Sequence, residues 1–161
     1  MREKYNTCCF TGHRDISAMT YQELLNQMLP LFKRLVDHGF EYFVCGGALG
    51  FDTFAANFIN SMKQSGYPVK LVLMLPCRDQ TARWSEYDKA VYKHILNTAD
   101  EVIWLADRYY SGCMQARNRA MVDASRACIC YLHETGHSGT RQTVEYAQSH
   151  GVAVVNVFRD R

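Results

Sequence analysis

The residues best suited to chemistry begin with a glycine-rich stretch, Cys45 to Asp52, which separates an apolar run from a segment patterned as a helix. Gly46 and Gly47 would let the backbone approach an anion, because glycine has no Cβ atom. The start of the following helix offers unpaired amides and a partial positive charge. Asp52 suits the N-cap of that helix, since its carboxylate can accept a hydrogen bond from a helical amide. This pattern favours phosphate binding, although such turns also occur for steric reasons alone.

A second glycine-containing helix start lies at residues 136–140. Here Gly139 precedes a helix-patterned segment that begins at Thr140, and the hydroxyls of Ser138 and Thr140 could supplement the helix amides. This stretch predicts a second phosphate site or a contact with the other end of the same ligand. An ordinary capped loop is the alternative interpretation.

Arg117, Asn118 and Arg119 fall in the first turns of another predicted helix. A cation near a helix N-terminus opposes the helix dipole, so Arg117 costs stability there unless it shares an anion. This mismatch favours a functional role. Pairing of the arginines with Asp107 or Asp123 is the competing interpretation.

Polar residues also follow the first predicted strand, at Thr11, Gly12, His13 and Arg14. His13 can titrate near neutral pH, and the forked guanidinium of Arg14 suits a phosphate or a carboxylate. The aromatic side chains of residues 84 and 87 could stack on a base. Their helical spacing is more typical of core residues, so they are left out of the predicted site.

Six apolar runs alternate with five helix-patterned segments. The predicted strands are residues 6–10, 41–44, 69–75, 101–106, 127–132 and 152–158; the predicted helices are residues 21–38, 53–63, 83–96, 114–125 and 140–150. The first helix begins with the capping-box pair Thr20 and Glu23, and Pro30 should bend or disrupt it. This order predicts one domain over residues 1–161, with a largely parallel sheet of about six strands between two helical layers. The polar clusters follow the strands, so we expect them to meet at one edge of the sheet.

Composition limits the class of protein. The chain has 161 residues, 48% of them hydrophobic and 21% charged, and it contains no run approaching the ~18 apolar residues of a membrane span. With no apolar leader at its start, it is expected to be cytoplasmic. Its net charge of +2 gives little support for a nucleic-acid partner. The seven cysteines form no Cys-x-x-Cys pair, so we expect reduced core thiols, no metal site and no cofactor.

Taken in order, these motifs resemble the SLOG superfamily, most closely its small YpsA-like branch. The matching stretches are residues 9–14, 46–52, 76–77, 112–114, 117–119, 139–140 and 143–147. The resemblance implies a Rossmann-like fold that binds nucleotides or nucleotide derivatives. It also raises the prospect of a homodimer, since relatives often pair through helices.

The superfamily includes the DNA-processing protein DprA and the LOG phosphoribohydrolases, which release a base from a nucleoside monophosphate. Residues 117–119 are similar to the Arg-Asn-Arg of DprA and stand where LOG enzymes carry a catalytic arginine, so the resemblance implies this role for Arg117. The LOG signature Pro-Gly-Gly-x-Gly-Thr-x-x-Glu is matched only in part. Thr143 occupies the glutamate position, and Glu145 lies about 200° further around the helix.

Three functions are therefore in competition. The first is a sensor or carrier of a nucleotide or an ADP-ribose-like ligand. The second is a hydrolase of N-glycosidic bonds, in which Arg117 holds phosphate and Asp52 or Glu145 assists water. The third is single-stranded DNA binding as in DprA, which needs a basic groove and exposed aromatic platforms that the charge balance supports poorly.

Overall fold

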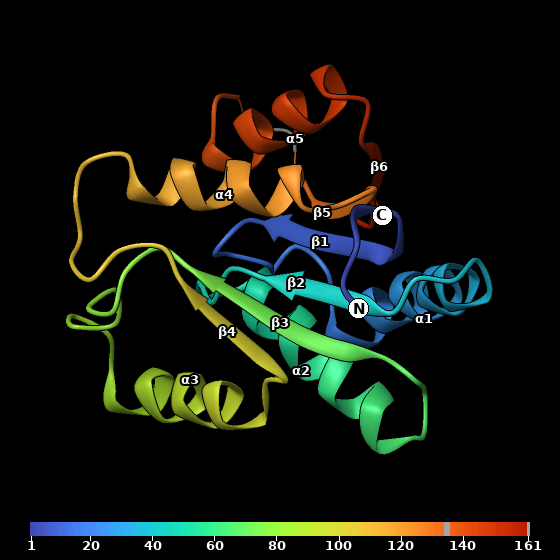
Figure 1. The fold of residues 1–161 in the computed structure, drawn as a ribbon, viewed down its shortest axis with the longest axis horizontal. Coiled ribbons are helices and arrows are strands. Elements are labelled where there is room, and N and C mark those ends of the chain that lie inside the picture. Colours follow the sequence, from blue (N-terminus) through green and yellow to red (C-terminus); the bar gives the residue numbers. More distant parts are fainter. Residues whose placement is uncertain (134–135, 161) are drawn as a thin grey trace.

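The computed structural model describes residues 1–133 and 136–160, and it contains a six-stranded parallel sheet between helical layers (Figure 1). The strands are β1 (Thr7–Gly12), β2 (Tyr42–Cys45), β3 (Lys70–Leu75), β4 (Glu101–Trp104), β5 (Ala127–Tyr131) and β6 (Ala153–Asn156). The helices are α1 (Tyr21–Asp37), α2 (Phe51–Gln64), α3 (Glu86–Thr98), α4 (Cys113–Asp123) and α5 (Gly139–Ser149), and a short 3₁₀ helix (Lys4–Asn6) precedes β1. The predicted three-layer α/β architecture is confirmed.

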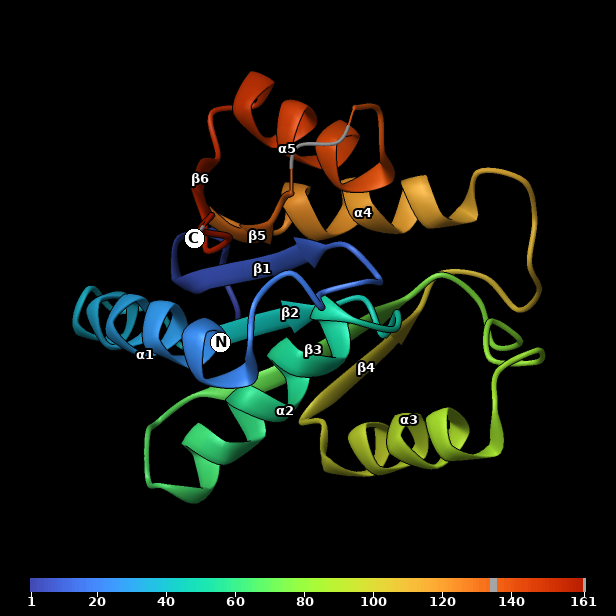
Figure 2. The ribbon, with the colours of Figure 1, turned by 180° about the vertical axis from the view of Figure 1, so that it is seen from behind.

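The strand order is β4-β3-β2-β1-β5-β6, and every neighbouring pair is parallel. The chain builds outward from β1 to β4, and α4 then crosses the sheet to deliver β5 to the other side of β1 (Figure 2). The strand order therefore switches between β1 and β5. In open parallel sheets, ligands bind at the carboxyl ends of the strands beside such a switch.

The two faces of the sheet are both apolar and are covered by different helices. α1, α2 and α3 cover one face, while α4 and α5 cover the other (Figures 1 and 2). Alternation along β1 sends Cys8 and Phe10 into the first layer and Cys9 into the second. Burial on both sides explains why β1, β2, β3 and β5 read as continuous apolar runs in the sequence.

Side-chain caps set several helix boundaries. The predicted capping box is confirmed, because Thr20 Oγ1 accepts from the Glu23 amide at 3.1 Å and Glu23 Oε1 accepts from the Thr20 amide at 2.8 Å. α1 continues across Pro30, so the helix is not broken there. α3 begins later than predicted because Ser85 is its N-cap, with its Oγ accepting from the Asp88 amide at 3.1 Å.

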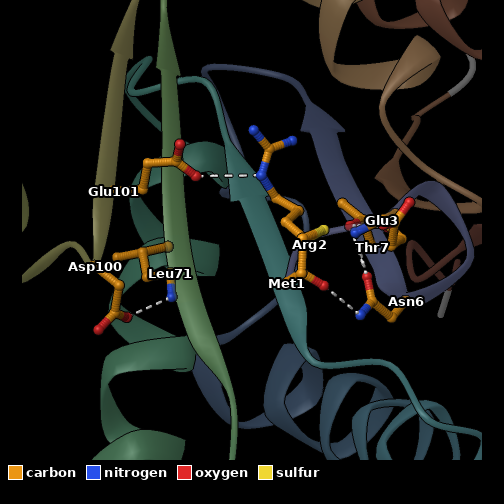
Figure 3. A network of polar contacts seen from close by, with 8 residues as sticks. All are labelled: Met1, Arg2, Glu3, Asn6, Thr7, Leu71, Asp100 and Glu101. Atoms are coloured by element: carbon orange, nitrogen blue, oxygen red, sulfur yellow. Dashed lines mark hydrogen bonds and ion pairs between the residues drawn. The ribbon is translucent and has the colours of Figure 1, made fainter.

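The amino ends of the strands are held by polar contacts within the protein (Figure 3). Arg2 Nε lies 3.2 Å from Glu101 Oε1 and so ties the N-terminal segment to β4. Asp100 Oδ2 accepts from the Leu71 amide and from Lys63 Nζ, each at 2.8 Å. These polar groups at the amino edge satisfy one another.

Three further properties bear on the sequence-based expectations. Within the described residues, no helix combines the length and apolarity needed to cross a bilayer. The seven cysteines are all buried, with free thiols. Over residues 1–133 and 136–160, no group of three or more His, Cys, Asp or Glu side chains is placed to hold a metal ion.

Candidate functional site

A cavity of about 420 Å³ opens at the carboxyl edge of the sheet, beside the switch between β1 and β5. Its volume is within the range typical of small-molecule sites. Every strand from β1 to β5 contributes its following loop or helix to the wall. The lining residues are Thr11, Gly12, His13, Arg14, Ala48, Asp52, Gln80, Trp84, Tyr109, Met114, Arg117, Asn118, Gly139 and Thr140.

The cavity brings together all of the predicted ligand-binding residues except Gly46 and Gly47. Polar residues scattered over about 130 positions of sequence thus share one wall, because parallel strands place their carboxyl ends at the same edge. That these residues contact a ligand stays a prediction.

Arg117 is the most deeply buried charged group of the wall. It lies in the second turn of α4, and only 4% of the residue is exposed. Its Nη1 donates to the Gly46 carbonyl, its Nε donates to Asn118 Oδ1 at 2.8 Å, and its Nη2 lies 3.9 Å from Met114 Sδ. These contacts fix the orientation of the guanidinium. Because a guanidinium carries five N–H groups, further donors remain for a ligand in the cavity.

The two glycines after β2 do not line the cavity; Gly46 lies against Arg117, and Gly47 lies against Leu75. A Cβ atom on Gly46 would lie 2.5 Å from Arg117 Nη1, so only glycine allows the guanidinium to sit against the backbone. Gly47 has φ +74°, and a Cβ there would lie 2.4 Å from Leu75 Cδ2. The group close to the Gly46 backbone is thus the Arg117 guanidinium, and the group close to Gly47 is the Leu75 side chain. Ligand binding by these two glycines stays a prediction.

The prediction that Asp52 caps α2 is wrong. Gly50 occupies the N-cap, and Asp52 lies in the first helical turn, where its Oδ2 accepts from the Ala48 amide at 3.2 Å. Asp52 is 6% exposed, and burial raises the pKa of its carboxyl group, against the opposing effects of the Arg117 charge and the loop amides. Asp52 thus holds the glycine loop by a hydrogen bond from the first turn of α2, and it is not the N-cap of that helix.

Burial also lowers the pKa of Arg117, and the Asp52 charge opposes this shift. The two groups are therefore electrostatically linked across the cavity floor. The competing interpretation, that Arg117 pairs with Asp107 or Asp123, is wrong. Asp107 Oδ1 instead lies 3.3 Å from Arg78 Nε, and Asp123 Oδ1 accepts from the Tyr146 hydroxyl at 2.7 Å.

The loop after β1 is tied to both neighbouring strands. His13 Nε2 lies 3.0 Å from the backbone nitrogen of His133 and 3.2 Å from its carbonyl oxygen, which links the loop to the end of β5. The His13 carbonyl accepts from the Phe51 amide at 3.1 Å, at the start of α2. Arg14 follows with an exposed side chain at the cavity rim. This loop therefore presents an exposed cation on a backbone that is held in place.

The start of α5 supplies backbone amides to the part of the cavity wall that follows β5. Ser138 is the N-cap, and its Oγ accepts from the Arg141 amide at 3.1 Å. The amides of Gly139 and Thr140 belong to the first turn, where helical amides have no intrahelical acceptor, and both residues line the cavity. Glu145 is exposed on α5 and lies outside the cavity wall, so Asp52 is the only proposed catalytic carboxylate that lines it.

Sequence reasoning missed five lining residues: Ala48, Gln80, Trp84, Tyr109 and Met114. Gln80 and Tyr109 follow β3 and β4, so their position after strands was a usable signal. Trp84 was predicted to be a core residue of a helix, but it precedes the Ser85 cap and reaches the cavity. Its predicted companion Tyr87 is 78% exposed and does not line it.

A family model described as the YspA SLOG family matches residues 8–156. The chain belongs to this family. It is 32% identical over 142 residues to the uncharacterized SPbeta prophage-derived protein YoqJ of Bacillus subtilis, with 80% of this chain and 82% of YoqJ covered. It is also 32% identical over 102 residues to the UPF0398 protein BH1768 of Halalkalibacterium halodurans, with 62% of this chain and 54% of that protein covered.

Among solved structures, this SLOG chain is similar to DNA processing protein A of Helicobacter pylori, whose structure was described for its single-stranded DNA binding mode. The TM-score is 0.63 and the identity 19%, with 92% of this chain and 63% of the other chain covered. At this identity the likeness establishes a shared fold. This chain also spans only about half of the UPF0398 protein and less than two thirds of the DprA chain.

Proposed function

We propose that this SLOG protein binds a nucleotide or an ADP-ribose-like derivative in the cavity at the carboxyl edge of its sheet, as a ligand sensor or carrier. The observation that carries the proposal is the buried guanidinium of Arg117, which lines the same cavity as Arg14 and the first turn of α5. Arginine forks and helix N-termini are both well suited to holding phosphate.

The electrostatics of the cavity support an anionic ligand. Burying a cation is costly unless an opposite charge accompanies it. Asp52 provides part of that charge, but its own burial raises its pKa, so the negative form is held at a cost. A ligand phosphate beside Arg117 would add negative charge without requiring another buried carboxylate.

Ligand binding can be tested by thermal unfolding of the protein with nucleoside mono- and diphosphates, NAD, ADP-ribose, cyclic nucleotides and a short DNA oligonucleotide. A ligand at one hundred times its Kd should stabilise the protein by about 2.7 kcal/mol, which raises the Tm by several degrees. Arg14→Ala should weaken binding of the active compound, while Arg34→Ala, on α1 and away from the cavity wall, should not. Stabilisation by the oligonucleotide alone would overturn the proposal in favour of DNA binding.

Hydrolysis of an N-glycosidic bond is a second candidate function, and the placement of Asp52 favours it. Burial raises the pKa of the Asp52 carboxyl, and a raised pKa makes a carboxyl a better general acid or base. Chromatography of each nucleotide after incubation tests this candidate. Free base and ribose 5-phosphate would identify an enzyme, whereas intact ligand at every time point would reject hydrolysis.

A further inference from the structure

The geometry points to a nucleobase subsite at the end of the cavity formed by the loops after β3 and β4, and we propose that it selects a 6-aminopurine. This inference rests on the proposed function and specifies the ligand. Three residues outside the predicted site form this end of the cavity: Gln80, Trp84 and Tyr109. They offer aromatic rings and an amide, whereas the loops after β1 and β5 offer the Arg14 cation and the first amides of α5.

The sheet topology separates the two ends of the cavity. The phosphate-suited start of α5 follows β5, whereas Gln80 and Trp84 follow β3, with β1 and β2 between them. At about 4.8 Å per strand, three spacings place β3 and β5 about 14 Å apart. A free phosphate ion cannot span that distance, so the two ends are suited to different parts of one extended molecule.

Tyr92 of α3 positions both Gln80 and Trp84. Its ring lies edge-on to the Trp84 ring, with centroids 5.5 Å apart and an interplanar angle of 82°. Its hydroxyl accepts from Gln80 Nε2 at 3.2 Å. Tyr92 is itself 9% exposed, so the indole and the amide rest on a buried support.

Tyr109 joins this group from the next loop. Its amide donates to Asp79 Oδ1 at 2.9 Å, and the Arg78 amide donates to the Asp107 carbonyl at 3.3 Å, so the loops after β3 and β4 are bonded to each other. The Tyr109 side chain is 62% exposed and lines the cavity. Exposed aromatic rings held on a fixed backbone are the usual platforms for base stacking.

Gln80 sets the proposed preference between bases. Because its Nε2 donates to Tyr92, its Oε1 is directed away from that bond; within residues 1–133 and 136–160 this oxygen has no hydrogen-bond donor. A 6-aminopurine presents an amine that can donate to this oxygen. A 6-oxopurine presents a second acceptor, which would leave both oxygens unpaired.

Calorimetric titration with AMP, IMP and ribose 5-phosphate tests the subsite, since AMP and IMP differ at position 6 and the third compound has no base. We expect AMP to bind about tenfold more tightly than IMP. The difference in affinity between AMP and ribose 5-phosphate should be larger than about tenfold, because ribose 5-phosphate has no base to stack. Gln80→Leu should remove the preference for AMP. Trp84→Phe should weaken AMP binding without altering ribose 5-phosphate binding, and Tyr87→Ala, at an exposed aromatic residue outside the cavity, serves as the matched control.

Fluorescence provides a second measurement in the unmodified protein. The chain has two tryptophans, and bound AMP should quench Trp84 emission, with Trp84→Phe losing the response. Equal affinity for AMP and ribose 5-phosphate would overturn the base subsite but leave the phosphate end standing. Tighter binding of IMP would show that the amide presents its nitrogen and would overturn the aminopurine preference. Failure of all three ligands to bind would instead reject the proposed function.

Discussion

Arg117 Nη1 donates a hydrogen bond to the carbonyl oxygen of Gly46, a residue 71 positions earlier in the chain. This bond joins the second turn of α4 to the loop after β2. It fixes a buried cation at the floor of the cavity. The proposed phosphate end of the site depends on this arrangement.

Gly46→Ala should destabilise the protein, because the new Cβ would lie 2.5 Å from Arg117 Nη1. Overpacking of this kind typically costs about 1–3 kcal/mol. Urea unfolding measures the loss. Gly139→Ala is the matched control for stability, since a Cβ there meets nothing within 4 Å, and equal stability of the two variants would contradict the close packing at Gly46.

Asp52→Asn should change how stability depends on pH. The pKa of Asp52 is raised in the folded protein, so its favourable contribution is complete below the unfolded value of about 3.8 and is lost as the pH rises through the folded pKa. We therefore expect the asparagine variant to match the wild type near pH 3.5. At pH 7 the asparagine variant should be at least as stable as the wild type, because it avoids the cost of burying a carboxylate. That cost is about 1.4 kcal/mol for every unit by which the pKa of Asp52 in the folded protein exceeds its value in the unfolded protein.

Chemical denaturation at both pH values checks this prediction. An Asp52→Asn variant that loses more stability at pH 7 than at pH 3.5 would show that the attraction between Asp52 and Arg117 outweighs the cost of burying the carboxylate. The structure would then hold a strongly stabilising ion pair.

Ala48→Asp should block an anionic ligand while leaving the fold in place. Ala48 lines the cavity beside Asp52, and a second carboxylate there would repel a phosphate. Ala48→Asn is the neutral control of similar size. Loss of binding in the aspartate variant and retention in the asparagine variant, both with wild-type circular dichroism, is the expected result; equal binding by the two would argue against an anion at this wall.

Gly47 is a poor site for the same test. Its φ of +74° and the 2.4 Å distance from a Cβ to Leu75 Cδ2 mean that Gly47→Asp should lower the Tm by itself. Thermal unfolding without ligand measures this effect. A Gly47→Asp protein with an unchanged Tm would contradict it.

The layers of the fold were predictable because each element carries its own local signal. Strands buried on both faces give continuous apolar runs, and the Thr20 capping box marks the start of α1 in sequence and in structure. Helix starts were less predictable where the apolar spacing extends beyond the residue that caps the helix. Ser85 begins α3 beyond Trp84, so Trp84 lies in the preceding loop, where it packs against the core as predicted and also lines the cavity.

The polar content of the site was predictable in part, since glycine and charged residues follow strands whose carboxyl ends must share an edge. The pairings within it were not. The contact of Arg117 with Gly46 depends on how α4 crosses the sheet. No local pattern in the sequence specifies that crossing.

Binding of a nucleotide phosphate beside Arg117 is tested most directly by titration calorimetry of the wild type and Arg117→Lys. Lysine keeps the charge but loses the fork, so we predict that the ligand found by thermal unfolding binds at least about tenfold more weakly to a variant that is still folded. Arg34→Lys on α1 should bind as the wild type does. Unchanged affinity in the folded Arg117→Lys variant would contradict phosphate binding by this guanidinium.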